Sequence, residues 1–239
     1  MLVNATSNVQ LEKSKISFNR FIGIQIIGNS LFPHIHQCVI ENNDCSGIQI
    51  CVGNKCNIRN NDISSNQNGI EILSADPYIS TNKVCKNYKE GIIAKAYDHL
   101  YCFPILYNNE ILSNRMNGVH CIGLNNNTKL INNRVIAYNK MAGIRVDDEA
   151  HIVAAKNLIL KNLEQGILIV EKSSAHIENN IIKENVKANI AFGGENSCNT
   201  AIIRNKIMGS RCEGIFMVES GKSFIHNNEI YDNYDGIIS

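Results

Sequence analysis

The strongest chemical signal in the sequence is an acidic run, Asp147-Asp148-Glu149, with a histidine two residues beyond it. A second pair of an acid and a histidine, Asp98-His99, lies about 50 residues earlier. Carboxylates beside a histidine can coordinate calcium or transfer protons as general acids and bases. We therefore take Asp98, His99, Asp147, Asp148 and Glu149 as candidate binding residues. The commoner alternative is that they are solvated loop charges.

Metal binding and redox chemistry have no comparable pattern. Zinc sites usually need close pairs of ligands, and none of the nine cysteines forms a Cys-x-x-Cys pair. The seven histidines share no repeat position that would bring three of them together. We expect no metal, no cofactor and reduced, mostly packed thiols at Cys38, Cys45, Cys51, Cys56, Cys85, Cys102, Cys121, Cys198 and Cys212.

Any such site must be positioned by a repeat that runs along the whole chain. A glycine followed by isoleucine or valine recurs every 22 to 27 residues. The glycines are Gly23, Gly47, Gly69, Gly91, Gly118, Gly143, Gly166, Gly214 and Gly236, and Asn189 fills the remaining slot. Self-similarity at a period of this length is the signature of a solenoid.

Each repeat also carries two asparagines, in the form I-x-x-N-x-I-x-x-N-x-x-x-G-I-x-I with one x sometimes absent. The first asparagine lies at 61, 82, 109, 133, 157, 180, 205 and 228, and the second at 19, 43, 66, 87, 114, 139, 162, 185 and 233, with Ser210 in the remaining repeat. Isoleucines at period two indicate short strands. Asparagine and glycine tolerate left-handed backbone conformations, so we predict them at the corners.

Three strands and three corners in about 23 residues predict one coil of a right-handed parallel β-helix. Coils stacked about 4.8 Å apart bury the isoleucines and let the asparagine amides bond from coil to coil. We predict an all-β, single-stranded solenoid of about ten coils, forming a single domain over 1–239 that could be a piece of a longer protein. Its open ends would need a cap, from a partner or from a missing segment.

Composition excludes several classes of protein. Hydrophobic residues make up 44% and charged residues 19% of the chain, which is typical of a folded protein. The 23 basic and 22 acidic side chains nearly balance, so we expect no nucleic-acid partner. No apolar run reaches the roughly 18 residues that span a bilayer. No secretory signal is visible either, so we expect no membrane association and a cytoplasmic location.

The side chains that alternate with the buried isoleucines after each glycine form a column facing outward. It changes from polar to apolar along the rod and reads Gln25, Gln49, Glu71, Ile93, His120, Arg145, Leu168, Ala191, Phe216 and Ile238. The apolar part, represented by Leu168, Phe216 and Ile238, is a candidate protein-contact face. Cover by a flanking loop is an equally weighted alternative.

The long insertion between Gly91 and Gly118 is the most aromatic stretch, with Tyr97, Tyr101 and Phe103 close together. Loops of this length often carry recognition surfaces. Aromatic residues of such a loop could stack on sugar rings. Packing on the rod is the alternative that we favour.

The repeat resembles the parallel β-helix repeats of the carbohydrate-binding and sugar-hydrolase (CASH) superfamily. Residues 227–237, NNEIYDNYDGI, are similar to its intracellular branch, which includes the β-helix F-box proteins and the Shc SH2-domain-binding protein. Members that cleave pectin carry Asn-Thr-Asp, Asp-Asp, Gly-His-Gly and Arg-Ile-Lys motifs, and only Asp147-Asp148 has a counterpart here. The resemblance implies a rod that binds other proteins, although no F-box segment occurs in these 239 residues.

These observations predict a non-catalytic intracellular β-solenoid that binds other proteins as an interaction module or scaffold. The expected settings are substrate recognition in a ubiquitin ligase or a cytoskeletal or ciliary assembly. The alternative is a carbohydrate-active enzyme, either a polysaccharide lyase or a glycoside hydrolase, or a glycan-binding protein. Turnover of a uronide polymer that disappears when Asp147 and Asp148 are replaced would decide for the alternative.

Overall fold

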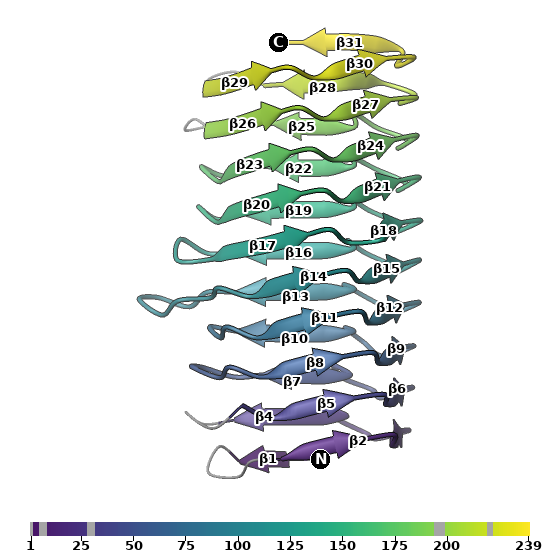
Figure 1. The fold of residues 1–239 in the computed structure, drawn as a ribbon, viewed down its shortest axis with the longest axis vertical. Coiled ribbons are helices and arrows are strands. Elements are labelled where there is room, and N and C mark those ends of the chain that lie inside the picture. The colour runs from purple at the N-terminus through teal and green to yellow at the C-terminus, as the bar shows by residue number, and fades with distance from the viewer. Residues whose placement is uncertain (1, 5–8, 28–31, 194–198, 219–221) are drawn as a thin grey trace.

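The computed structural model describes residues 2–4, 9–27, 32–193, 199–218 and 222–239. Within these residues every regular element is a β-strand, and the strands form three parallel sheets. Figure 1 shows the resulting rod, in which successive coils stack from the N-terminal end to the C-terminal end. None of the described segments is a helix that could cross a membrane.

Each sheet collects one strand from every coil. Sheet A consists of β1 (Leu2–Asn4), β4 (Ile24–Ile27), β7 (Ile48–Ile50), β10 (Ile70–Leu73), β13 (Ile92–Lys95), β16 (Val119–Ile122), β19 (Ile144–Asp147), β22 (Ile167–Ile169), β25 (Ile190–Phe192), β28 (Glu213–Met217) and β31 (Asp235–Ile238). Sheet B consists of β2 (Gln10–Glu12), β5 (His34–His36), β8 (Asn57–Arg59), β11 (Tyr78–Ser80), β14 (Ile105–Tyr107), β17 (Asn127–Ile131), β20 (His151–Ala155), β23 (Ser174–Glu178), β26 (Asn199–Ile203) and β29 (Lys222–His226). Sheet C consists of β3 (Lys15–Ser17), β6 (Val39–Glu41), β9 (Asp62–Ser64), β12 (Lys83–Cys85), β15 (Glu110–Leu112), β18 (Val135–Ala137), β21 (Leu158–Leu160), β24 (Ile181–Lys183), β27 (Lys206–Met208) and β30 (Glu229–Tyr231). The predicted all-β solenoid of about ten coils, with three short strands per coil, is confirmed.

The register of the strands follows the isoleucine pattern. Inward positions such as Ile144 and Ile182 are completely buried and belong to one continuous core. The predicted outward column of sheet A is also in register from coil to coil, from Gln25 to Ile238. Strands with this alternation have one buried face and one face to solvent, so outward side chains are free to build a site.

The asparagines form two hydrogen-bonded ladders along the rod. In the first ladder, the Nδ2 and backbone N–H of Asn109 donate to Oδ1 of Asn133 at 3.1 and 3.0 Å. Asn133 in turn donates from Nδ2 to the backbone oxygen of Leu106 at 3.0 Å. These side chains are buried, so each bond satisfies a polar group that would otherwise be costly.

The backbone at the corners differs from the prediction. Left-handed φ angles occur at the residue before each ladder asparagine and not at the asparagine itself, as at Asn132 (φ 54°) and Lys161 (φ 53°). The residue that turns the chain therefore varies in type. The ladder asparagine is needed for its amide, which points inward, rather than for its backbone freedom.

The repeated glycine has a steric cause. A Cβ on Gly143 would lie 2.7 Å from the backbone oxygen of Gly166 and 2.8 Å from Nδ2 of Asn162. No real side chain can occupy that space. Asn189 fills a glycine slot at the coil whose successor carries Ser210 instead of a ladder asparagine, and the shorter side chain there leaves the room that Asn189 needs.

Candidate functional site

The outward face of sheet A carries a group of ionisable side chains that is largely shielded from solvent. We call Glu90, His120, Arg145 and Asp147 the sheet A cluster. His120 and Arg145 are neighbours in the outward column, one coil apart, and Asp147 ends β19 on the same face. Glu90 lies in the turn before β13, at the position that precedes the repeated glycine. Only 5% of the Glu90 side chain and 14% of the His120 side chain are exposed.

His120 lies at the centre of the cluster. Its Nδ1 is 3.3 Å from Oε1 of Glu90, and its Nε2 is 2.9 Å from Oδ2 of Asp147. Arg145 donates from Nε to both oxygens of Asp147, at 2.8 and 3.1 Å. The second oxygen of Glu90 accepts the backbone N–H of Asn117 at 2.7 Å. Both carboxylates are therefore fixed by a donor other than the histidine.

The carboxylates favour the protonated histidine. Burial would lower the pKa of His120, but the hydrogen bonds to Asp147 and Glu90 outweigh it and raise that pKa above its ordinary value of 6.5. Burial would likewise raise the pKa of Asp147, but its bonds to His120 and Arg145 hold the pKa below 3.8. The hydrogen bonds to Asp147 and Glu90 thus favour the imidazolium form of His120 over the neutral ring.

A further cation lies beside this group. Lys95 ends β13 and belongs to the same outward column as Asp147, with Ile122 between them. Within the described residues no ion pair includes Lys95, whereas Arg145 is already paired. Lys95 therefore places an unpaired cation on the outward face beside the cluster, one coil after Glu71. The arrangement can hold an anionic ligand and exchange a proton with it.

A second polar group continues the column toward the N-terminus. Oε2 of Glu71 accepts the hydroxyl of Ser46 at 2.8 Å and the amide Nε2 of Gln49 at 3.0 Å. Oε1 of Gln49 accepts Nε2 of Gln25 at 2.7 Å. This side of sheet A therefore presents fixed polar groups over several coils next to the cluster.

Of the five residues predicted as a binding site, only Asp147 belongs to the cluster. Asp148 and Glu149 form the following turn, where both have left-handed φ angles of 54° and 62°. Asp148 is exposed, and Glu149 pairs with Lys172 at 3.5 Å. The turn carries these two side chains away from the strand, so the acidic run does not act as one unit.

The other two predicted residues lie in the insertion that follows β13. Asp98 and His99 are both exposed there, and the backbone oxygen of Asp98 accepts Nδ2 of Asn125 at 3.2 Å. Among the described residues, no hydrogen bond or ion pair joins either side chain to Asp147. The prediction assumed that loops of neighbouring coils stack, but this insertion projects from the rod and keeps its tip apart (Figure 1).

Sequence reasoning missed three residues of the cluster for two different reasons. His120 and Arg145 are adjacent in the predicted outward column, and Asp147 lies two residues after Arg145, so it faces the same side of its strand. Comparing outward residues of neighbouring coils that are two positions apart would have brought His120 and Asp147 together. Glu90 gave no such signal. It lies in a turn, where the alternation of a strand does not determine the direction of a side chain.

Five of the eight described cysteines are buried thiols, and Cys45, Cys51 and Cys212 are partly exposed. Burial raises the pKa of Cys56 and Cys121 to about 12 and that of Cys102 to about 11. Thiols with such pKa values stay protonated near neutral pH and are poor nucleophiles. Eight cysteines are described and all are unbridged, and Cys198 lies outside the described residues. The described residues also contain no group of three or more histidines, cysteines and acids suited to a metal ion.

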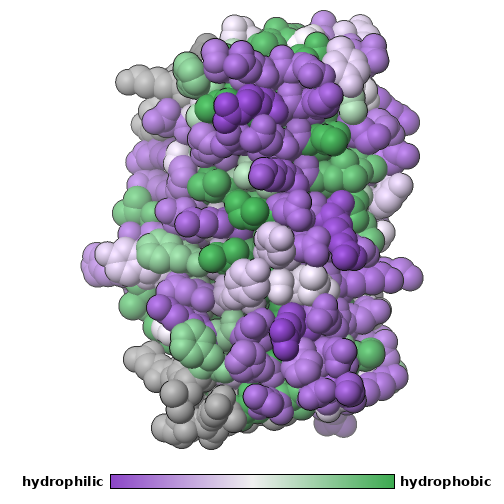
Figure 2. All heavy atoms as spheres, viewed as in Figure 1, coloured by the Kyte–Doolittle hydropathy of each residue, from purple (hydrophilic) through white to green (hydrophobic). Residues whose placement is uncertain are grey.

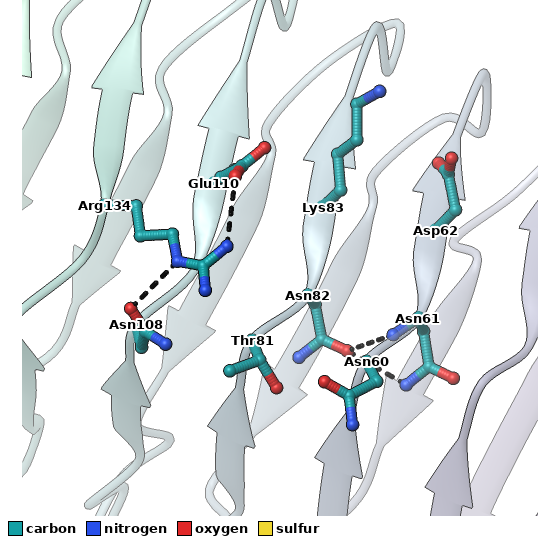
Figure 3. Close-up of a pocket in the computed structure, with 9 residues that line it drawn as sticks. All are labelled: Asn60, Asn61, Asp62, Thr81, Asn82, Lys83, Asn108, Glu110 and Arg134. Carbon is teal, nitrogen blue, oxygen red and sulfur yellow. Dashed lines mark hydrogen bonds and ion pairs between the residues drawn. The ribbon is translucent and has the colours of Figure 1, made fainter.

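A hollow of about 320 Å³ lies at the corner between sheets B and C (Figure 3). Its charged residues alternate in sign along the rod, with Asp62, Lys83, Glu110 and Arg134 on successive coils. Arg134 lies 3.6 Å from Glu110, and its side chain is 60% exposed. Exposed pairs of this kind contribute little energy, so the hollow is a weaker candidate than the sheet A cluster.

The structure contains no partner that would test the apolar end of the outward column as a protein-contact face. Leu168 and Phe216 are half-buried, and Ile238 is 37% exposed. A protein-contact face there stays a prediction, as does a cap on the ends of the rod.

Solved structures with a similar fold are polysaccharide epimerases. The A-module of the mannuronan C-5 epimerase AlgE6 from Azotobacter vinelandii has a TM-score of 0.58 at 11% identity, over 100% of this chain and 87% of that chain. The A-module of AlgE4 from the same organism has a TM-score of 0.50 at 14% identity, over 100% and 86%. A double mutant of the periplasmic alginate epimerase AlgG has a TM-score of 0.53 at 13% identity, over 96% of this chain and 50% of that one. No curated protein matches the chain in sequence.

These neighbours contradict the predicted non-catalytic scaffold. They are enzymes named for work on mannuronan or alginate, and one is named as periplasmic, which also contradicts the cytoplasmic, cytoskeletal or ciliary location. The prediction relied on the absence of contiguous catalytic motifs. In a solenoid, a site is assembled from outward residues of neighbouring coils, as in the sheet A cluster, so contiguous motifs are a poor guide.

A sequence model described as right-handed beta helix region matches residues 1–80 and 74–230, which is nearly the whole chain. This match supports the β-helix repeat and its handedness; it does not extend to the F-box or Shc-binding branch. The strand order and the match agree, and the chain belongs to the right-handed beta helix family.

Proposed function

We propose that this chain is a carbohydrate-active enzyme that transfers a proton on an acidic polysaccharide, with the sheet A cluster as its catalytic group. The observation that carries the proposal is His120, shielded between Glu90 and Asp147 beside the free cation of Lys95. Shielding strengthens each electrostatic contact in the site, and the fixed carboxylates hold the histidine in one orientation.

The chemistry of a uronate sugar fits these groups. The carbon next to the sugar carboxylate carries a hydrogen that can leave as a proton once a cation neutralises the carboxylate. We assign that neutralising role to Lys95, and proton transfer to His120 and its two carboxylates. Return of a proton from water to the opposite face of the carbon inverts it, and the cluster releases the abstracted proton to solvent, with no other bond changed. Loss of the neighbouring glycosidic oxygen, which leaves with a proton, would instead cleave the chain and form a double bond.

Two further facts support this substrate class. The solved structures of similar fold are named as epimerases of mannuronan and alginate, which are uronate polymers. The polar groups around Glu71 extend the outward surface over several coils, as a polymer requires. The proposal also implies a location outside the cytoplasm. The likeness of residues 227–237 to intracellular β-helix proteins carries no part of it.

The direct test is proton exchange on defined polymers. Polymannuronate and polygalacturonate are incubated with the protein in D2O, and nuclear magnetic resonance follows deuterium at the carbon next to the carboxylate. Ultraviolet absorbance follows unsaturated chain ends. We expect exchange with one polymer, and a loss of at least about 100-fold in the His120→Gln and Asp147→Asn variants, the range that a general acid or base contributes.

The matched control is His176→Gln on sheet B, where the histidine also contacts a carboxylate, at 3.1 Å, but is 38% exposed. It should retain wild-type exchange. Absence of exchange and elimination with both polymers, or equal rates for the His120→Gln and His176→Gln variants, would show that the sheet A cluster is not catalytic.

A further inference from the structure

Sheet B carries an exposed aromatic patch beside the projecting insertion. We call Tyr78, Tyr101, Phe103, Ile105, Tyr107 and Lys129 the sheet B patch. The four aromatic side chains belong to residues that are 37% to 61% exposed. The rings of Tyr101 and Phe103 are 5.3 Å apart, and those of Tyr78 and Tyr107 are 6.4 Å apart. Figure 2 looks onto this face, where apolar and weakly polar surface interrupts a hydrophilic surround.

A hollow of about 290 Å³ opens in the patch, lined by Phe103, Ile105, Asn127 and Lys129. Ile105 and Lys129 are partners in register on β14 and β17, so the hollow spans two adjacent coils. That step is about 4.8 Å, similar to the length of one sugar unit in an extended polysaccharide. One coil contributes the aromatic ring of Phe103, and the next coil contributes the amide of Asn127 and the ammonium group of Lys129.

The charge of the patch is positive and not compensated locally. Lys129 is exposed, and within the described residues no ion pair includes it. Asp76 lies at the border of the patch, where its Oδ1 accepts the backbone N–H of Phe103 at 2.8 Å. The ammonium group is therefore free to pair with an anionic ligand.

The insertion joins this patch to the sheet A cluster. It leaves β13 of sheet A just after Lys95 and enters β14 of sheet B just after Phe103 and Pro104. The loop therefore begins beside the cluster and ends beside the patch. A polymer that is long enough can contact both the sheet A cluster and the sheet B patch. Large exposed aromatic patches on soluble proteins commonly mark such binding surfaces.

We propose that the sheet B patch is an ancillary binding subsite for an acidic polysaccharide, distinct from the catalytic cluster. The apolar face of a sugar ring stacks on Phe103, its hydroxyl groups bond to Asn127, and its carboxylate pairs with Lys129. The substrate class rests on the proposed function, but the contacts are those of sheet B alone. Aromatic stacking and one screened ion pair make this a weak site that gains strength when several sugar units bind together.

The test measures binding rather than turnover. Affinity electrophoresis and calorimetry are run with polymannuronate, polygalacturonate and the neutral polymer dextran, in the His120→Gln background so that no probe is consumed. We expect Phe103→Ala and Lys129→Gln each to weaken binding of one acidic polymer about tenfold, which corresponds to about 1.4 kcal/mol. Added salt should reduce the effect of Lys129→Gln.

Matched controls lie on other faces of the rod. Tyr138→Ala removes a ring that is 51% exposed, and Lys140→Gln removes an exposed charge two residues later. Both should bind like the parent. Unchanged affinity in the Phe103→Ala and Lys129→Gln variants, or equal binding of dextran, would overturn the subsite.

The two proposals can fail separately. Binding that depends on Phe103 and Lys129 in a protein that never exchanges a proton supports the subsite and rejects the proposed catalysis. If proton exchange depends on His120 but the affinity for the polymer is unchanged by substitution of Phe103 and Lys129, the subsite is rejected and the catalysis is supported.

Discussion

The protonation state of His120 is set by residues that are far away in the sequence. Glu90 lies 30 residues before it and Asp147 lies 27 residues after it, yet both carboxylates contact the imidazole ring. Each acid is also held by another donor, so neither needs the histidine for its own position. The histidine can therefore exchange a proton while the surrounding groups stay in place.

This arrangement predicts a pH window for stability. The raised pKa of His120 means that its contribution is complete below its ordinary value of 6.5 and is lost as the pH rises through the raised value. The lowered pKa of Asp147 means that its contribution is complete above 3.8 and is lost as the pH falls through the lowered value. The difference in the free energy of unfolding between wild type and His120→Gln should be largest between these pH values, at about 1–3 kcal/mol, and it shows as a difference in Tm. Thermal melts across pH measure it.

The control for this prediction is Lys187→Gln, which removes an exposed ion pair of 3.0 Å with Glu164. Its melting temperature should follow that of the wild type at all pH values. A Tm difference for His120→Gln that is flat across pH would mean that the imidazole is not held as a cation.

Asn189 and Ser210 show how one residue compensates for another. Nδ2 of Asn185 donates to Oδ1 of Asn189 at 2.8 Å, and Nδ2 of Asn189 donates to Oδ1 of Asn233 at 2.9 Å. The Asn189 side chain thus replaces the ladder amide that Ser210 lacks. It reaches across two coils to do so.

Because Asn189 supplies the amide that is missing at Ser210, we expect the effects of substitutions at these two residues on stability to be strongly coupled. Asn189→Gly alone should cost about 1–3 kcal/mol because it leaves buried amides unpaired. Ser210→Asn alone should also destabilise, because the new side chain competes with Asn189 for the same space. The double variant restores the repeat and should cost much less than the sum of the single variants. Urea unfolding of all four proteins measures the coupling, and simple additivity would refute it.

Within a strand, whether a side chain points inward or outward determines its burial more than its residue type does. Ile181 and Ile182 are neighbours in β24, but Ile182 is fully buried whereas Ile181 is 40% exposed. The two positions have the same residue type and the same strand, so they isolate the effect of the inward face.

We expect Ile182→Asn to destabilise by about 3–5 kcal/mol, because it removes buried apolar surface and places an unpaired amide in the core. Ile181→Asn should change stability by less than about 1 kcal/mol. Denaturant unfolding of the two variants compares them directly. Similar unfolding midpoints would mean that the register of sheet C is shifted by one residue.

The sequence allowed the fold to be predicted because every coil repeats the same few requirements. Glycine is needed where a Cβ would meet the next coil, and asparagine is needed where an amide bonds along the rod. Both appear in the sequence at constant spacing. The left-handed corner position was not predicted because residues as different as Asn132 and Lys161 occupy it.

The candidate site was only partly predictable. Its strand residues follow the outward column, which the repeat determines, but Glu90 lies in a turn and is recruited from a different coil. The acidic run gave a misleading signal, because Asp147 ends a strand while Asp148 begins a turn. Residues adjacent in the sequence thus point to different places.

At the scale of the whole molecule, the backbone hydrogen bonds of the strands join each coil only to the coils next to it. Strand pairing within every sheet joins successive coils alone. The stability of such a rod is approximately a sum over coils and over the interfaces between them. Whole coils can therefore be removed in register without rearranging the others.

Deletion of residues 158–180 tests this property. It joins Asn157 to Ile181, the register partner of Leu158, and leaves the sheet A cluster intact. We expect a folded protein of lower stability that retains proton exchange. Circular dichroism and the exchange assay measure the two outcomes.

The matched deletion of residues 119–143 joins Gly118 to Ile144 and removes the coil that carries His120. It should also fold, but without exchange. An unfolded product in both cases would show that the coils are not independent, and exchange in this second protein would exclude His120 as a catalytic residue.

The graded outward column of sheet A gives the rod a direction. Fixed polar groups lie on the N-terminal side of the cluster, and Leu168, Ala191 and Phe216 lie on the C-terminal side. A polysaccharide also has a direction, because its reducing and non-reducing ends differ. Under the proposed function, a polysaccharide seated on this asymmetric track would bind in one orientation, with its two ends on opposite sides of the cluster.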